Sequence, residues 1–138
     1  MLKGKRIFAL LAAVLVLFIA GCSPVPPLPD GFDEDTVMQA AKDTIALLNA
    51  QDSAGLRAVS SDTLTAALTD ETLSAVYTDI SAGGAFLEYG EAAAFGADDK
   101  TTDTQYAVVV MQAKYESKTF TYTLSFDTDM KLVGLYYK

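Results

Sequence analysis

A change of hydrophobic period at Gly83-Gly84 constrains the fold of this chain more than any other feature. Before the two glycines, apolar residues recur at spacings of three and four, and after them they alternate with polar residues. The alternation is clearest at 119–126, where four large apolar residues interleave with hydroxyl residues. A period of two is typical of a strand with one buried face. The sequence therefore predicts helices first and a sheet afterwards, with strands at 86–95, 105–115, 119–127 and 132–137.

The residues before the glycines predict several helices with capped starts. Asp33, Glu34 and Asp35 suit the positive end of a helix dipole, and Asp52 and Ser61 offer N-caps for two later helices. The helix that follows Asp33 is expected to bury one apolar face, made of Val37, Ala41, Ile45 and Leu48. A last helix opening at Thr69-Asp70-Glu71 is expected to turn four residues inward, namely Leu73, Val76, Tyr77 and Ile80.

This order of elements predicts an α+β fold, with N-terminal helices packed on one face of a four-stranded antiparallel sheet. A length of 138 residues suits a single domain. We assign 1–21 to an export signal, 22–32 to a proline-rich tether and 33–138 to the folded domain.

Strand parity predicts which residues share a face of the sheet. Hairpin loops of even length keep opposed residues on the same side. On this basis the core side receives Ala107, Val109, Met111, Ala113, Phe120, Tyr122, Leu124, Phe126, Val133, Leu135 and Tyr137. The other side receives a row of threonines and five apolar or aromatic residues: Tyr106, Val108, Val110, Leu132 and Tyr136. Solvated sheet faces are usually more polar, so these five residues form a candidate interface with a second copy, as a homodimer, or with another protein.

The first 22 residues resemble the export signal of a bacterial lipoprotein. A basic head, 1–6, precedes an apolar run at 7–19 of about 13 residues, shorter than the ~20 that span a bilayer. The run ends in Ile19-Ala20-Gly21-Cys22, which resembles the lipobox, in which small residues suit the signal peptidase and the cysteine thiol is lipidated. We expect a lipid anchor on Cys22 that holds the mature protein on the extracytoplasmic face of the bacterial cell membrane. An ordinary secretory signal with a chance cysteine is the alternative.

All four prolines follow within residues 24–29, and such density favours a semi-rigid polyproline II spacer. A proline-rich docking motif is the alternative. Loss of Lys3, Lys5 and Arg6 with the signal would change the formal charge from −8 to −8 − 3 = −11. Nucleic-acid binding needs basic residues to displace counterions, so no nucleic-acid partner is expected.

The residue inventory excludes several chemistries. There is no histidine, and the one cysteine is Cys22, so catalytic triads, Cys-His pairs and zinc sites are excluded. No glycine-rich phosphate loop is present. The acidic residues at 98–103 and 127–129 do not follow a calcium-loop pattern. We predict that the chain is not an enzyme and has no catalytic residue, metal site or cofactor.

Several segments resemble domain-of-unknown-function family 3887. These are Gly84-Ala85-Phe86 before the sheet, Tyr106-Ala107-Val108-Val109-Val110, and the closing segment 126–135. The resemblance runs from Asp33 to the C-terminus. It implies a nuclear-transport-factor-2-like (cystatin-like) cone and a setting among lipoproteins and secreted proteins of Gram-positive bacteria. The family has no established catalytic residues that could be assigned to positions of this chain.

A second hypothesis places a small-molecule pocket, or the remnant of an enzyme site, in a cleft between helices and sheet. The residues that would line this cleft are Tyr77, Met111, Tyr122 and Tyr137. An ordinary core with tyrosine hydroxyls at its rim is the other interpretation, and the sequence favours it.

Overall fold

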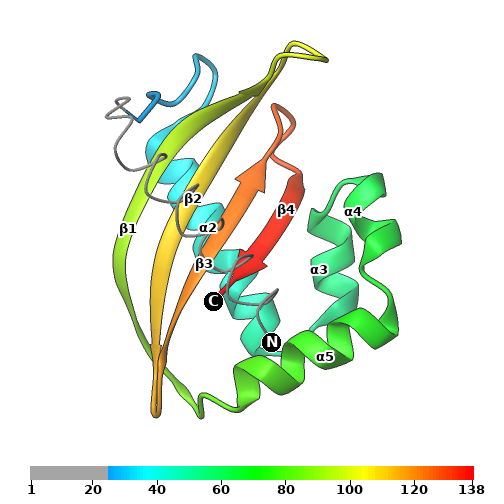
Figure 1. Cartoon of the computed structure of the whole chain (residues 1–138), viewed down its shortest axis with the longest axis vertical. Coiled ribbons are helices and arrows are strands. Elements are labelled where there is room, and N and C mark those ends of the chain that lie inside the picture. The colour runs from blue at the N-terminus through cyan, green and yellow to red at the C-terminus, as the bar shows by residue number, and fades with distance from the viewer. Residues whose placement is uncertain (1–24) are drawn as a thin grey trace, which may run out of the picture.

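The computed structural model describes residues 25–138, which form four helices followed by four strands. The helices are α2 (Glu34–Asn49), α3 (Ser53–Val59), α4 (Asp62–Ala67) and α5 (Asp70–Ser81). The strands are β1 (Phe86–Asp99), β2 (Thr104–Tyr115), β3 (Thr119–Phe126) and β4 (Leu132–Tyr137). The strands form one antiparallel sheet in the order β1-β2-β3-β4, with α2 behind it and α3, α4 and α5 beyond the β4 edge (Figure 1). The predicted α+β fold is therefore confirmed. Within the described residues, no helix has the length and apolar character needed to cross a membrane.

Side-chain caps define where the helices begin. The carboxylate of Asp33 accepts hydrogen bonds from the backbone N–H and the hydroxyl of Thr36, at 2.9 and 2.8 Å, and these bonds lower the pKa of Asp33. Asp52, Ser61 and Thr69 each cap the next helix by accepting from a backbone N–H. Each of these bonds satisfies an N–H that the first helical turn leaves without a partner. The caps predicted at Asp52 and Ser61 are thus in place, and Asp33 and Thr69 add two more.

The core lies between α2 and the inner face of the sheet. The expected apolar face of α2 is buried, and Thr44 is buried beside it because its hydroxyl donates to the carbonyl of Ala40 at 2.8 Å. Pairing of Met111 with Tyr122 sets the register between β2 and β3. From the sheet the core receives the predicted residues of β2 and β3, namely Ala107, Val109, Met111, Ala113, Phe120, Tyr122, Leu124 and Phe126.

The sequence assigned the wrong faces of the sheet to the first two residues of β4, Leu132 and Val133. Leu132, expected on the outer face, pairs with Phe126 and is fully buried in the core. The next pair is Ser125 with Gly134, so β4 carries an extra residue, Val133, in a bulge. The bulge turns Val133 to the outer face, although the sequence placed it in the core. Beyond the bulge the predicted parity returns, because the extra residue shifts the alternation by one position and so offsets the displacement at Leu132.

The strand β1 is longer than predicted, and the proline-rich segment packs against it. The strand continues to Asp99 because 97–99 pair with 104–106. The N–H of Gly96 donates to the carbonyl of Pro26 at 2.9 Å, and Leu28 and Phe32 pack against the core. In this structure the second half of the 22–32 segment therefore belongs to the folded domain. It covers part of a strand edge that would otherwise be open to pairing.

Candidate functional site

The four residues predicted to line a cleft do not form one open pocket. Tyr122 has no exposed surface and Met111 is 1% exposed, whereas Tyr77 and Tyr137 are half-buried at separate places. Burial raises the pKa of Tyr122 well above its usual value, and its hydrogen bond to Tyr115 adds to this. Tyr122 is therefore a neutral core residue at physiological pH, and a ligand reaches it only if the core opens.

Tyr137 and Tyr77 each tie one element of the domain to another. The hydroxyl of Tyr137, on β4, donates to the carboxylate of Asp79 on α5 at 2.7 Å. Burial and this bond raise the pKa of Tyr137 to about 12. The hydroxyl of Tyr77, on α5, lies 2.9 Å from the hydroxyl of Ser53 at the start of α3. Both tyrosines thus fix the position of α5.

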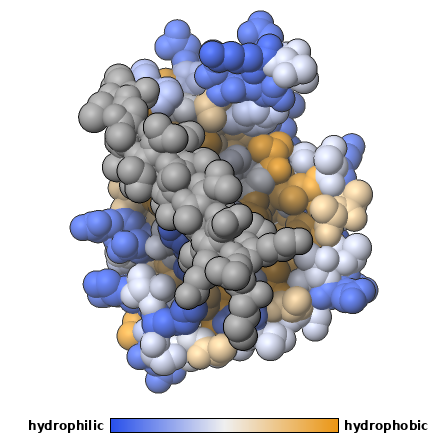
Figure 2. All heavy atoms as spheres, viewed as in Figure 1, coloured by the Kyte–Doolittle hydropathy of each residue, from blue (hydrophilic) through white to orange (hydrophobic). Residues whose placement is uncertain are grey.

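The outer face of the sheet is the first surface with the character of a binding site. Its central rows follow the strand pairing and consist of Ala93, Phe95, Ala97, Tyr106, Val108, Val110, Thr123, Ser125, Gly134 and Tyr136. None of these ten residues is charged. Where this face is visible in Figure 2, hydrophobic side chains lie between hydrophilic ones toward the upper and lower ends of the molecule.

Four of the five predicted interface residues lie on this outer face. Tyr136 is 62% exposed, Tyr106 and Val110 are half-buried, and Val108 is 8% exposed. Leu132 is the exception, and Val133 takes its place beside them. A shallow hollow of about 280 Å³ opens on the face between Ala97, Tyr106, Val108, Ser125, Val133 and Gly134.

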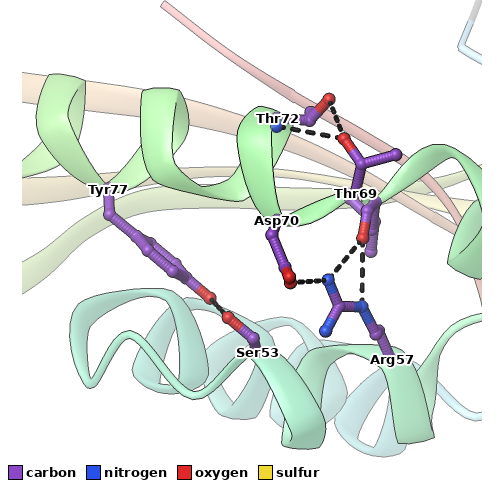
Figure 3. A network of polar contacts seen from close by, with 7 residues as sticks. Ser53, Arg57, Thr69, Asp70, Thr72 and Tyr77 are labelled. Carbon is purple, nitrogen blue, oxygen red and sulfur yellow. Dashed lines mark hydrogen bonds and ion pairs between the residues drawn. The ribbon is translucent and has the colours of Figure 1, made fainter.

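A polar groove between α3 and α5 is a second candidate site, and the sequence did not predict it. Its volume is about 420 Å³, and it is lined by Gln51, Ser53, Asp70, Ser74, Tyr77, Thr78 and Ser81. At one end Arg57 donates to the carbonyl of Leu68 at 2.8 and 3.0 Å and to the carboxylate of Asp70 at 2.7 Å (Figure 3). Farther along, the Tyr77 side chain reaches from α5 to Ser53 (Figure 3).

One signal in the sequence could have indicated the groove. Ser74, Tyr77, Thr78 and Ser81 recur at helical spacing, so they share one face of α5. That face carries hydroxyl groups where a purely structural helix would expose charged residues. The partners from the 51–53 segment are far away in sequence and could not be assigned without the fold.

No metal centre or cysteine chemistry can be placed on the described part of the chain. Within residues 25–138, no three His, Cys, Asp or Glu side chains come together in a way that could hold a metal ion. Cys22 and the predicted export signal lie outside the described residues.

The helices, sheet and surfaces together define a small α+β domain in which helices are followed by an open antiparallel sheet. Residues 41–135 match the model of the family described as "Protein of unknown function (DUF3887)", and the chain therefore belongs to this family. The resemblance predicted from the sequence is thus confirmed.

A solved structure is similar over most of the chain. It is titled "NMR structure of protein from Ruminococcus gnavus ATCC 29149", shares 28% sequence identity and superposes with a TM-score of 0.72. The match covers 81% of this chain and 96% of the other. No curated protein matches this chain. The comparisons thus give the fold and the family, and they name no activity.

Proposed function

We propose that this protein is a lipid-anchored extracytoplasmic module that is not an enzyme and associates with a second copy of itself through the outer face. The observation that carries the proposal is the absence of charge from the ten central residues of that face. The formal charge of the whole chain is −8, so two copies repel each other over most of their surfaces. A charge-free, partly apolar face is where two such acidic copies can approach without that repulsion.

The membrane anchor is the second part of the proposal. It rests on the basic head, the short apolar run and the Ile19-Ala20-Gly21-Cys22 motif. In the structure the chain is held at Pro26, four residues after Cys22. Four extended residues span at most about 14 Å, so an anchor on Cys22 would keep the β1 edge near the membrane. Copies confined to one membrane surface also meet at a raised effective concentration, which helps a weak interface to form.

Sedimentation equilibrium tests the self-association. The full-length protein in detergent is compared with a Val110→Lys and Tyr136→Lys double variant, which places two positive charges on the outer face. Ala66→Lys is a matched control, because Ala66 is an exposed residue of α4 on another part of the domain.

The proposal predicts a dimer for the wild type and the control, and a monomer for the double variant with an unchanged melting temperature. A wild type that stays monomeric at high concentration contradicts it. So does a double variant that dimerises as strongly as the wild type.

A further inference from the structure

The groove between α3 and α5 has a lining that selects the chemistry of a ligand. Five of its seven residues carry hydroxyl groups: Ser53, Ser74, Tyr77, Thr78 and Ser81. Gln51 adds an amide, whose nitrogen lies 3.3 Å from the hydroxyl of Ser81. Hydroxyl and amide groups both donate and accept hydrogen bonds. The groove therefore offers an array of neutral hydrogen-bonding groups.

The charges around the groove argue against an ionic ligand. Asp70 is the one charged residue in the lining, and its carboxylate is bound by Arg57 at 2.7 Å. The guanidinium of Arg57 is also bound to the carbonyl of Leu68. Because Arg57 already binds these partners, an anionic ligand would have to compete with them in an acidic protein.

The ring of Tyr77 is held in a fixed position at the groove. Its hydroxyl lies 2.9 Å from that of Ser53, which joins α5 to the start of α3. The side chain is half-buried, so part of its surface stays open. An aromatic ring next to hydroxyl groups offers a ligand one apolar surface and several hydrogen-bonding groups. Because the ring is already held in place, it loses little side-chain entropy when a ligand binds.

The backbone beside the groove turns sharply after α2. Gln51 has a φ of 55°, in the left-handed region that residues with a Cβ rarely adopt. This conformation turns the chain between α2 and α3 and brings the Gln51 amide to α5. The N–H groups of Gln51 and Asp52 donate to the carbonyls of Leu48 and Leu47, which is a usual way for a helix to end, so the end of α2 fixes this conformation.

We propose that the groove binds a neutral saccharide, with the Tyr77 ring against one sugar face and the surrounding hydroxyl and amide groups on the sugar hydroxyls. The proposal goes beyond self-association and depends neither on the outer face nor on the anchor. The groove is built from α3 and α5, at the opposite end of the domain from the described start of the chain near β1 (Figure 1). A saccharide could therefore be bound while the outer face is occupied.

Nuclear magnetic resonance titration of the full-length protein tests the proposal. A polyoxyethylene detergent is used, because detergents with sugar headgroups would compete for the groove. The probes are tetra-N-acetylchitotetraose, cellotetraose and maltotetraose, with tetragalacturonate as an anionic probe of equal length. At least one neutral probe is expected to shift the signals of Gln51, Tyr77 and Ser81 in a saturable way, and tetragalacturonate is not.

Two variants and one control locate the binding. Tyr77→Ala is expected to weaken the affinity about tenfold, the size of one lost aromatic contact. Because this change also removes a tie between helices, Ser74→Arg serves as a second test. Ser74 is exposed on α5, so the arginine fills the groove without entering the core. Thr101→Ala, at an exposed position of the turn between β1 and β2, is expected to leave the affinity unchanged.

Ser74→Arg should abolish binding while the melting temperature stays that of the wild type. The proposal is overturned if none of the three neutral probes binds, if the shifted signals lie away from α3 and α5, or if Ser74→Arg binds as well as the wild type. Equal binding of tetragalacturonate would also overturn it, since the site would then not select neutral ligands.

Discussion

The phenol oxygens of Tyr115 and Tyr122 lie 2.8 Å apart inside the core, between β2 and β3. The Tyr115 hydroxyl also donates to the side-chain carbonyl of Asn49 at the end of α2. A buried hydroxyl without a hydrogen-bond partner lowers the stability of the folded state. These two hydrogen bonds give each of the three side chains a partner. The same contacts hold the last turn of α2 against the sheet.

Removing the inner hydroxyl tests this arrangement. Tyr122→Phe leaves Tyr115 bound to Asn49, so we expect a loss of about 1 kcal/mol in the free energy of unfolding. Tyr115→Phe leaves both Tyr122 and Asn49 without this partner, and we expect a loss of about 2–3 kcal/mol. Urea unfolding measures both. The double variant should cost less than the sum, and strict additivity would show that the hydroxyls do not interact.

The stability of the domain should fall at alkaline pH. Burial raises the pKa of Tyr122, and burial with the bond to Asp79 raises that of Tyr137 from 10.0 to about 12. A raised phenol pKa means that the folded state holds its proton more tightly than the unfolded state does. This stabilisation is complete below pH 10 and is lost as the pH rises from 10 toward 12. Urea unfolding at several pH values measures the slope, which Tyr137→Phe should reduce; an unchanged slope argues against the assignment.

Gly96 should not tolerate a side chain. A Cβ at Gly96 would overlap the carbonyl oxygen of Pro27 and would come within 3.0 Å of the Pro29 ring. We expect Gly96→Ala to lower the free energy of unfolding by about 1–3 kcal/mol, since the docked segment must move. Gly134→Ala is the matched control, because its Cβ would lie 3.3 Å from the Ser125 hydroxyl. Equal effects of the two changes in thermal unfolding would mean that the segment at 25–29 is not docked on β1.

The bulge in β4 predicts opposite results at adjacent positions. Leu132 is fully buried, so Leu132→Ala should cost about 2–5 kcal/mol of unfolding free energy. Val133 lies on the outer face, so Val133→Ala should cost about 1 kcal/mol or less. Urea unfolding of the two variants decides the register. If Val133→Ala lowers the free energy of unfolding more than Leu132→Ala does, the bulge is contradicted and the simple alternation expected from the sequence is correct.

Features set by neighbouring residues could be read from the sequence. The caps at Asp33, Asp52, Ser61 and Thr69 need only a side chain and an N–H a few residues away. The alternation in β3 likewise depends on one buried face. The bulge at Val133 could not be predicted, because it depends on how the 127–131 turn closes, with Asp127 accepting from Asp129 and Lys131.

The candidate sites also differ in whether they depend on neighbouring residues or on residues far apart in the sequence. Four of the five outer-face residues follow from strand parity, which is local. The residues of the proposed cleft do not form one pocket because Met111 and Tyr122 are buried in the core, and periodicity does not show how closely a helix approaches a sheet. The α3–α5 groove depends on the contact between Ser53 and Tyr77, 24 positions apart in sequence.

Metabolic labelling with radioactive palmitate is the most direct test of the proposed place of this protein at the membrane. The wild-type chain should incorporate the label and sediment with membranes, and Cys22→Ala should incorporate none and leave the membrane fraction. A wild-type protein that takes up no palmitate, or a Cys22→Ala protein that stays fully anchored, would contradict a lipid anchor on Cys22.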